Sequence, residues 1–216
     1  ENYQEYKKKI FFSDKLEILK AITKKNKNLS NSLKTNILKE TLGNESISKK
    51  ISIKLASINS KNIKKNTIFV GVKGKKIDGN IFANSAINNG AIFAITNKKN
   101  KNSKMIFQKN PLKFLYKVCS IYRKTLNANN IAITGSAGKT SVKELIGFCL
   151  KKLEKTYFSQ DSFNNKFGVP LSIFNTPENT KFAVLEVGMD KKGEIDYLTK
   201  LIKPNLGLIT NISYAH

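Results

Sequence analysis

The stretch IAITGSAGKTS, residues 131–141, carries the clearest structural signal in this chain. A short apolar run leads into a glycine-rich turn, and the turn opens onto a Lys-Thr pair and an amphipathic helix. This order predicts a phosphate-binding loop, because glycines let backbone N–H groups face phosphates and a helix N-terminus favours negative charge. The strict P-loop spacing is not met, since Ile133 stands where its first glycine belongs and Gly135 follows two residues later.

This loop predicts a Mg²⁺-nucleotide site. We expect Lys139 to reach the outer phosphates and the Thr140 hydroxyl to bind Mg²⁺. The alternative interpretation is a glycine-rich turn that binds nothing. The residues expected to contact the nucleotide are Gly135, Ser136, Ala137, Gly138, Lys139, Thr140 and Ser141.

The chain is strongly basic, with 39 Lys and Arg against 15 Asp and Glu and a formal net charge of +24 over 216 residues. The excess lies in residues 1–130, which hold 28 basic and 7 acidic residues. Such a charge suggests nucleic-acid binding, so a lysine-rich nucleic-acid-binding module in residues 1–130 is one alternative. Arg123 is the only arginine, however, and Lys, Asn and Ile are abundant together, as in AT-rich genomes. We therefore do not expect a nucleic-acid partner.

The sequence also carries information about the cellular location of the protein. No run of 18 apolar residues occurs, so no membrane span is expected. Residues 1–32 are polar and lysine-rich and do not resemble a signal peptide. Cys119 and Cys149 are each expected on the apolar face of a helix, as buried free thiols in a reducing compartment. These features predict a cytoplasmic protein.

The N-terminal half alternates between strand and helix signals, which is typical of an α/β fold. Residues 1–32 are interpreted as a tail or linker, with a short strand at 10–12 and a helix at 15–22. A first domain is expected at residues 33–127. Its clearest elements are strands near 67–72 and 91–95, and a helix that Asn110 caps.

The second domain is expected at residues 128–216, with a mostly parallel sheet. Strands are predicted at 157–159, 182–187 and 206–210, with a helix at 193–203. The helix after the phosphate loop is expected to turn one apolar face to this sheet, made by Val142, Leu145, Ile146, Cys149 and Leu153.

Three further positions are candidates for chemistry. Glu186 ends a buried strand, at the sheet edge where parallel sheets bind ligands, and a buried carboxylate needs a cation or an ion pair. We predict a metal role, and the alternative is an ion pair with a nearby lysine. His216 follows the next strand on the same edge. Asn164 and Asn165 precede Gly168 and, taken alone, are ordinary turn residues.

Four motifs in one order then resemble the Mur ligase family. They are TGSAGKTSVKE at 134–144, FNNKFGVPL at 163–171, EVGM with GEI at 186–195, and ITNI with AH at 209–216. The form of the second motif is similar to the branch of the family that adds D-alanyl-D-alanine to UDP-N-acetylmuramoyl-tripeptide.

Other stretches resemble the family more loosely. The motifs NSK at 59–61 and IFVGVKG at 68–74 are similar to its UDP-binding domain, which implies substrate-binding roles for Ser60 and Lys61. The family has Asp-Ser-Arg where this chain has Asn-Ser-Lys. Residues 1–22 are similar to the C-terminal end of the branch that adds the third peptide residue, which suggests a fusion of the two enzymes.

The resemblance implies an ATP-dependent, amide-bond-forming ligase of peptidoglycan precursor synthesis, acting through an acyl phosphate. Lys139, Asn164 and Asn165 would serve catalysis, and Thr140, Glu186 and His216 would hold Mg²⁺. ATP, UDP-N-acetylmuramoyl-tripeptide and D-alanyl-D-alanine would be the substrates of a monomeric enzyme. An alternative is another ligase of the superfamily, of the folylpolyglutamate type or of the branch that adds the third residue.

The implied fold is an N-terminal α/β UDP-substrate domain followed by a truncated P-loop domain. By the resemblance, the family's carbamylated lysine, adenine pocket and C-terminal domain would lie beyond His216. We therefore expect residues 1–216 alone to be inactive.

Overall fold

The computed structural model describes residues 32–43, 51–160 and 163–213, which fall into two units, Glu1–Ser52 and Ile53–His216. In the first unit, helix α2 (Leu33–Leu42) begins after Ser32, whose hydroxyl accepts the N–H of Thr35 at 3.4 Å. The strand and helix predicted before residue 23 lie outside the described residues. The predicted division at residues 32 and 127 stays a prediction.

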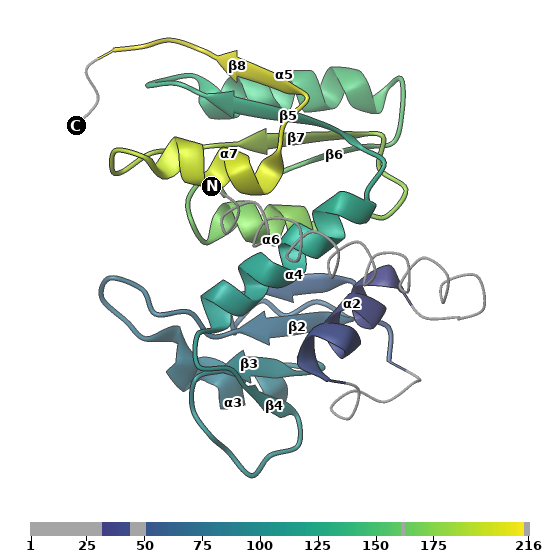
Figure 1. The fold of residues 1–216 in the computed structure, drawn as a ribbon, viewed down its shortest axis with the longest axis vertical. Helices are drawn as coiled ribbons and strands as arrows, with labels where there is room; N and C mark the ends of the chain where they lie inside the picture. The colour runs from purple at the N-terminus through teal and green to yellow at the C-terminus, as the bar shows by residue number, and fades with distance from the viewer. Residues whose placement is uncertain (1–31, 44–50, 161–162, 214–216) are drawn as a thin grey trace, which may run out of the picture. The chain divides into compact units, whose positions relative to one another are not determined.

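The second unit contains two parallel sheets, both visible in Figure 1. The first has the strand order β1-β2-β3-β4, and all three strand pairs are parallel. It is built from β1 (Leu55–Ser57), β2 (Thr67–Val70), β3 (Ala94–Thr96) and β4 (Met105–Phe107), with η2 (Gly79–Phe82) and α3 (Ala83–Asn88) between β2 and β3. The sequence interpretation placed no strand at β4. Its three residues are flanked by lysine-rich loop and carry too short an apolar run to indicate one.

The second sheet has the order β6-β7-β5-β8, and its strands are also all parallel. The prediction of an α/β fold with mostly parallel strands is confirmed. The carboxyl ends of these strands lie at one edge of the sheet, where the phosphate loop begins. The elements are β5 (Asn129–Thr134), α5 (Lys139–Lys151), β6 (Thr156–Phe158), α6 (Gly168–Asn175), β7 (Phe182–Glu186), α7 (Glu194–Ile202) and β8 (Leu206–Ile209).

Helices cover both faces of the second sheet, with α5 on one side and α6 and α7 on the other (Figure 1). Ile133 and Val184 belong to the cluster that packs against Val142 and Ile146 of α5. Because side chains alternate along a strand, Glu186 points to the same side as Val184. The carboxylate is therefore directed toward α5 and the phosphate loop.

The predicted apolar face of α5 is only partly right. Val142 and Ile146 pack against the sheet as expected. Leu145 and Leu153 are instead 64% and 76% exposed, and Cys149 is exposed as well. The residues of α5 that are fully buried against the sheet are Lys143 and Gly147. Gly147 is close to the ring of Phe158, where a Cβ would collide. The buried face of α5 is therefore rotated from the predicted one towards Lys143 and Gly147, and it includes a charged side chain that an apolar pattern does not count.

The longest described helix, α4 (Pro111–Thr125), contacts β2, α6 and α7. It begins as predicted, with the Asn110 side chain accepting the N–H of Lys113 at 2.9 Å. Cys119 is buried, as expected. Among the described residues, no helix combines the length and apolar character that a bilayer span requires.

The single arginine has a structural role at the end of α4. Arg123 donates from Nε to the carbonyl of Ile202 at 2.6 Å and from Nη2 to that of Lys203 at 2.5 Å. These carbonyls end α7, where intrahelical donors run out. The guanidinium therefore caps α7, and burial lowers its pKa.

Candidate functional site

The phosphate loop runs from the end of β5 to the start of α5. Gly135 and Gly138 have φ values of 138° and 77°, which side chains with a Cβ rarely adopt. A Cβ on Gly135 would also collide with the hydroxyl of Thr210 and lie 3.0 Å from the backbone of Asn211. The glycines therefore allow a tight turn at the N-terminus of α5, which is an anion-binding position.

The loop is fastened to the segment that follows β8. The N–H of Ala137 donates to the Asn211 side chain at 2.8 Å, and Thr210 donates its hydroxyl to the carbonyl of Ala137 at 2.5 Å. Ser136 donates its hydroxyl to the carbonyl of Ser213 at 2.9 Å and accepts that residue's N–H at the same distance. These hydrogen bonds link the turn to the segment that follows β8.

Lys139 lies across the loop. Its Nζ donates to the carbonyl of Gly135 at 2.7 Å and to that of Ser136 at 3.3 Å. The ammonium group is half-buried and faces a cleft of about 320 Å³ beside the loop. The cleft is lined by Thr134, Gly135, Ser136, Lys139, Met189, Ile195, Ile209, Asn211, Ile212 and Ser213.

The centre of the site is Glu186, whose side chain is 1% exposed. Thr140 donates its hydroxyl to Oε2 at 2.8 Å, and the Asn164 amide donates to Oε1 at 2.8 Å. The ammonium of Lys143 lies 3.9 Å from Oε2 and 3.1 Å from Oε1 of Glu144. Glu186 thus brings together three elements, β7, α5 and the loop before α6, next to the phosphate-binding turn.

The two expectations for Glu186 both have support in this geometry. The carboxylate and the Thr140 hydroxyl are hard oxygen donors beside a phosphate loop, and Mg²⁺ prefers a few such ligands together with water and phosphate oxygens. The alternative, an ion pair with a lysine, is present as the contact with Lys143. Within the described residues no cluster of three or more His, Cys, Asp or Glu could hold a metal alone. His216 lies outside those residues.

The two adjacent asparagines have different surroundings. Asn164 contacts Glu186 with its amide, and its backbone carbonyl accepts the N–H of Gly188 at 2.6 Å. The side chain of Asn165 instead accepts the N–H groups of Phe167 and Gly168 at 2.9 and 3.0 Å, which starts α6. Only Asn164 lies at the carboxylate.

The predicted substrate residues Ser60 and Lys61 lie on the loop after β1, in the first sheet. Ser60 is buried, and its carbonyl accepts the side-chain amide of Asn89 at 2.7 Å. Lys61 is exposed, with its N–H bonded to the Asn59 side chain at 3.0 Å. The turn thus presents the Lys61 ammonium to solvent.

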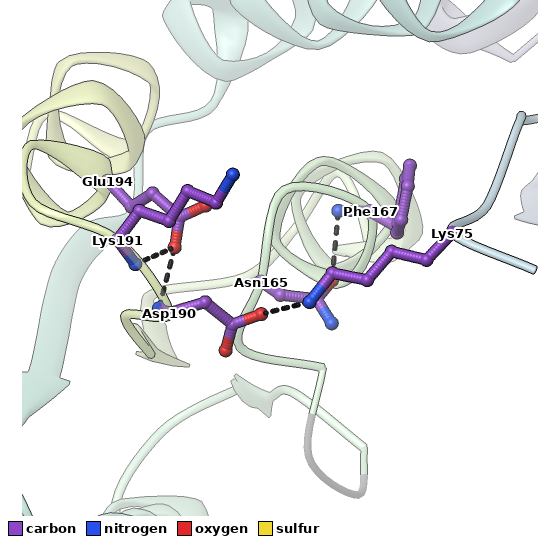
Figure 2. A network of polar contacts seen from close by, with 6 residues as sticks. All are labelled: Lys75, Asn165, Phe167, Asp190, Lys191 and Glu194. Carbon is purple, nitrogen blue, oxygen red and sulfur yellow. Dashed lines mark hydrogen bonds and ion pairs between the residues drawn. The ribbon is translucent and has the colours of Figure 1, made fainter. Parts of the chain in front are cut away.

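A polar network joins loops from the two sheets, as Figure 2 shows. Lys75 forms an exposed ion pair with Asp190 at 3.3 Å. The Glu194 carboxylate accepts the N–H groups of Asp190 and Lys191 at 2.7 and 3.1 Å, and so fixes the turn before α7. The ion pair is solvent-screened and contributes little to stability. The bonds from Glu194 are therefore the part of this network that shapes the turn between Glu186 and α7.

The sequence interpretation missed four residues of this site. Lys143 was overlooked because the apolar pattern assigned its face of α5 to solvent, although a position three residues after Thr140 lies on the same side of a helix. Thr210, Asn211 and Ser213 were not singled out. Only their position in the fold could have identified them. Because β5 and β8 are parallel neighbours, the segments that follow the two strands meet at one edge of the sheet.

These features define the class: a P-loop α/β protein with a buried carboxylate at the loop, suited to a metal-bound nucleotide. Residues 52–127 match the family described as "Mur ligase family, catalytic domain", and residues 133–216 match the "Mur ligase middle domain". The chain belongs to the Mur ligase family.

Curated relatives match over most of this chain. The UDP-N-acetylmuramoyl-tripeptide–D-alanyl-D-alanine ligase of Buchnera aphidicola subsp. Baizongia pistaciae is 38% identical over 170 residues, covering 77% of this chain and 37% of that protein. The ligase of the same name from Bacillus subtilis is 32% identical over 184 residues, covering 83% and 40%. The chain thus spans about two fifths of the length of these relatives.

Solved structures of Mur ligases also resemble this chain. Crystal structure I of MurF from Acinetobacter baumannii superposes with a TM-score of 0.71 at 27% identity, covering 83% of this chain and 41% of that one. MurF ligase from Thermotoga maritima in complex with ADP gives 0.62 at 29% identity, covering 73% and 37%. The Mur ligase fold expected from the motifs is therefore confirmed over these residues.

Proposed function

We propose that the protein is an ATP-dependent ligase that joins D-alanyl-D-alanine to UDP-N-acetylmuramoyl-tripeptide, in the synthesis of peptidoglycan precursors. The named relatives support this assignment over the matched two fifths of their length. The observation that carries it is the bond between Thr140 and Glu186 at the end of the phosphate loop. It joins the nucleotide-binding turn to a buried carboxylate.

The donor set fits Mg²⁺. The Thr140 hydroxyl and the Glu186 carboxylate would hold the cation, and the chemistry it would supply is neutralisation of charge on the nucleotide phosphates. We also assign His216 to this cation, from its order in the family motifs. The rest of the coordination would be water and phosphate oxygen.

Other residues would position the phosphates. Backbone N–H groups at the start of α5 would bind them, and Lys139, now bonded to loop carbonyls, would turn to the outer phosphates. Asn164 would orient Glu186 and lie close to the transferred group. We extend a role to Asn165 in shaping the same turn, because its side chain starts α6.

The proposed chemistry has two steps. A terminal carboxylate oxygen of the tripeptide attacks the γ-phosphorus of ATP, the bond from that phosphorus to the ADP oxygen breaks, and an acyl phosphate forms. The amine of D-alanyl-D-alanine then attacks the acyl carbon, the carbon–oxygen bond to phosphate breaks, and the amine loses a proton. The chain's part in both steps is to orient the reactants and neutralise charge.

We assign the uridine nucleotide to the first sheet, with Ser60 and Lys61 on the loop after β1, and we place the domain boundary at residue 127. The separate matches at 52–127 and 133–216 support that boundary. Lys61 would meet a phosphate as a point charge, because an ammonium lacks the bidentate geometry of arginine. We further propose a monomer that acts in the cytoplasm, where water-soluble UDP-linked precursors would be its substrates.

Phosphate release by the full-length protein tests this function. With ATP and Mg²⁺, we expect release to require both UDP-N-acetylmuramoyl-tripeptide and D-alanyl-D-alanine. Folate with glutamate is the control pair, and release with that pair alone would assign the protein to the folylpolyglutamate type. Sedimentation of the same sample tests the monomer.

A further inference from the structure

Lys143 is a buried charge that the proposed chemistry does not use. Its side chain is 0% exposed, on the face of α5 that packs against the sheet. It follows Thr140 by three residues, so both side chains lie on the side of the helix that faces Glu186. An ammonium group removed from water requires compensating negative charge.

Two carboxylates lie near this ammonium. Glu144 is closer, at 3.1 Å, but its side chain is 50% exposed. Glu186 is at 3.9 Å and only 1% exposed. Charge interactions are strong in a low-dielectric interior and are screened by water and salt at the surface. The buried pair is therefore the stronger of the two, although its atoms are further apart.

Glu186 in turn needs a cation. Thr140 and Asn164, which donate to its two carboxylate oxygens, are neutral and do not cancel its charge. A buried carboxylate without an opposite charge strongly destabilises a fold. When no metal is bound, the ammonium of Lys143 is placed to supply that charge.

We propose that Lys143 is the internal counter-ion of Glu186, standing in the metal-free protein for the divalent cation that the carboxylate holds when nucleotide is bound. It is a positioning residue that acts through Glu186 and touches no substrate. The proposal rests on the proposed function in one respect only, the metal role of Glu186.

Two consequences follow. Removing the ammonium leaves Glu186 uncompensated, so the loss of stability should disappear when the carboxylate is removed as well. A divalent cation at Glu186 would also replace the missing positive charge. Because the ammonium of Lys143 repels such a cation, removing the ammonium should strengthen cation binding at Glu186. Lys143→Met should then be stabilised by Mn²⁺ more than the unaltered protein is.

A double-mutant cycle on the full-length protein tests the first consequence, with thermal unfolding in EDTA as the readout. We expect Lys143→Met to lower the midpoint by several degrees, and Lys143→Met/Glu186→Gln to recover most of that loss. Lys143→Met/Glu144→Gln should not recover it. Lys151→Met, which removes an exposed lysine from the same helix, is the matched control and should change little.

Recovery with Glu144→Gln in place of Glu186→Gln would overturn the proposal, and so would additive losses in the Lys143–Glu186 cycle. If Lys143→Met alone does not fold, a folded Lys143→Met/Glu186→Gln protein is itself the expected rescue. If neither folds, the proposal fails.

Mn²⁺ without nucleotide separates this proposal from the metal assignment. We expect the rise in midpoint on adding Mn²⁺ to be larger in Lys143→Met than in the unaltered protein, and to vanish with Glu186→Gln. A rise that survives Glu186→Gln contradicts the metal role of Glu186, while the EDTA cycle still decides the role of Lys143. A rise that needs Glu186 but is equal with and without Lys143 overturns the counter-ion proposal alone.

Discussion

Thr140 donates its hydroxyl to Oε2 of Glu186 at 2.8 Å, although the two residues are 46 positions apart in the chain. Parallel pairing of β5 with β7 sets this contact, because it places Glu186 beside Ile133 at the start of the phosphate loop. One hydrogen bond thus joins a residue in the first turn of α5 to the carboxylate that ends β7.

We predict that Thr140→Ala weakens Mg²⁺-nucleotide binding about 10- to 100-fold, the range typical when a group that orients a metal site is lost. Thr140→Ser keeps the hydroxyl and should retain most of the affinity. Calorimetric titration of the full-length protein with ADP and Mg²⁺ measures both. Equal losses for alanine and serine would show that the methyl group matters and the hydroxyl does not.

Asn164 and Asn165 should differ in their effect on catalysis. We predict that Asn164→Ala lowers kcat about 10-fold or more, because Glu186 loses the donor to Oε1. It should also cost about 1–3 kcal/mol of stability, since a buried carboxylate oxygen is left without that donor. Asn165→Ala should cost about 1 kcal/mol of stability, as caps do, and leave kcat nearly unchanged. Urea unfolding and phosphate-release kinetics on both variants provide the comparison. Equal losses of kcat would contradict the assignment.

Gly135→Ala should damage the loop. The residue has a φ of 138°, and a Cβ would meet the hydroxyl of Thr210, so we predict a loss of about 1–3 kcal/mol and of nucleotide binding. Gly207→Ala is the matched control, because it lies in β8 and an added Cβ there would have no atom within 4 Å. Chemical denaturation measures both. A fully stable Gly135→Ala would show that the loop can relax away from Thr210.

We predict that the protein loses stability at alkaline pH as the buried phenol of Tyr157 ionises. Burial raises the pKa of its phenol from 10.0 to about 12. Between these values the unfolded chain has released the proton while the folded protein retains it, so the free energy of unfolding falls as pH rises. The contribution is fully present below pH 10 and is lost by about pH 12. Denaturation across this range should show a shallower fall for Tyr157→Phe, and identical slopes would contradict the assignment.

Much of the second sheet could be predicted from sequence because its signals are local. The apolar run before Gly135, the carboxylate that ends β7 and the Asn110 cap each occupy a few consecutive residues. The helix face of α5 could not be predicted in this way. An amphipathic pattern counts apolar side chains, and burial of Lys143 depends on a carboxylate 43 positions further along.

The contacts between the phosphate loop and the segment after β8 could not be predicted from local sequence patterns either. Asn211 and Ser213 reach Ala137 and Ser136 only because β8 pairs with β5. The sequence placed these residues after a strand but offered no partner for them. Predicting these contacts would have required knowing that β5 and β8 are neighbouring parallel strands.

The transfer of phosphate to a carboxylate is the central claim, and an isotope label tests it most directly. The full-length protein would be given ATP, Mg²⁺, D-alanyl-D-alanine and a UDP-N-acetylmuramoyl-tripeptide whose terminal carboxylate carries heavy oxygen. Mass spectrometry should find one labelled oxygen in each phosphate released and one fewer in the amide product, because the acyl phosphate passes that oxygen to phosphate. Unlabelled phosphate released together with the amide product would contradict the account.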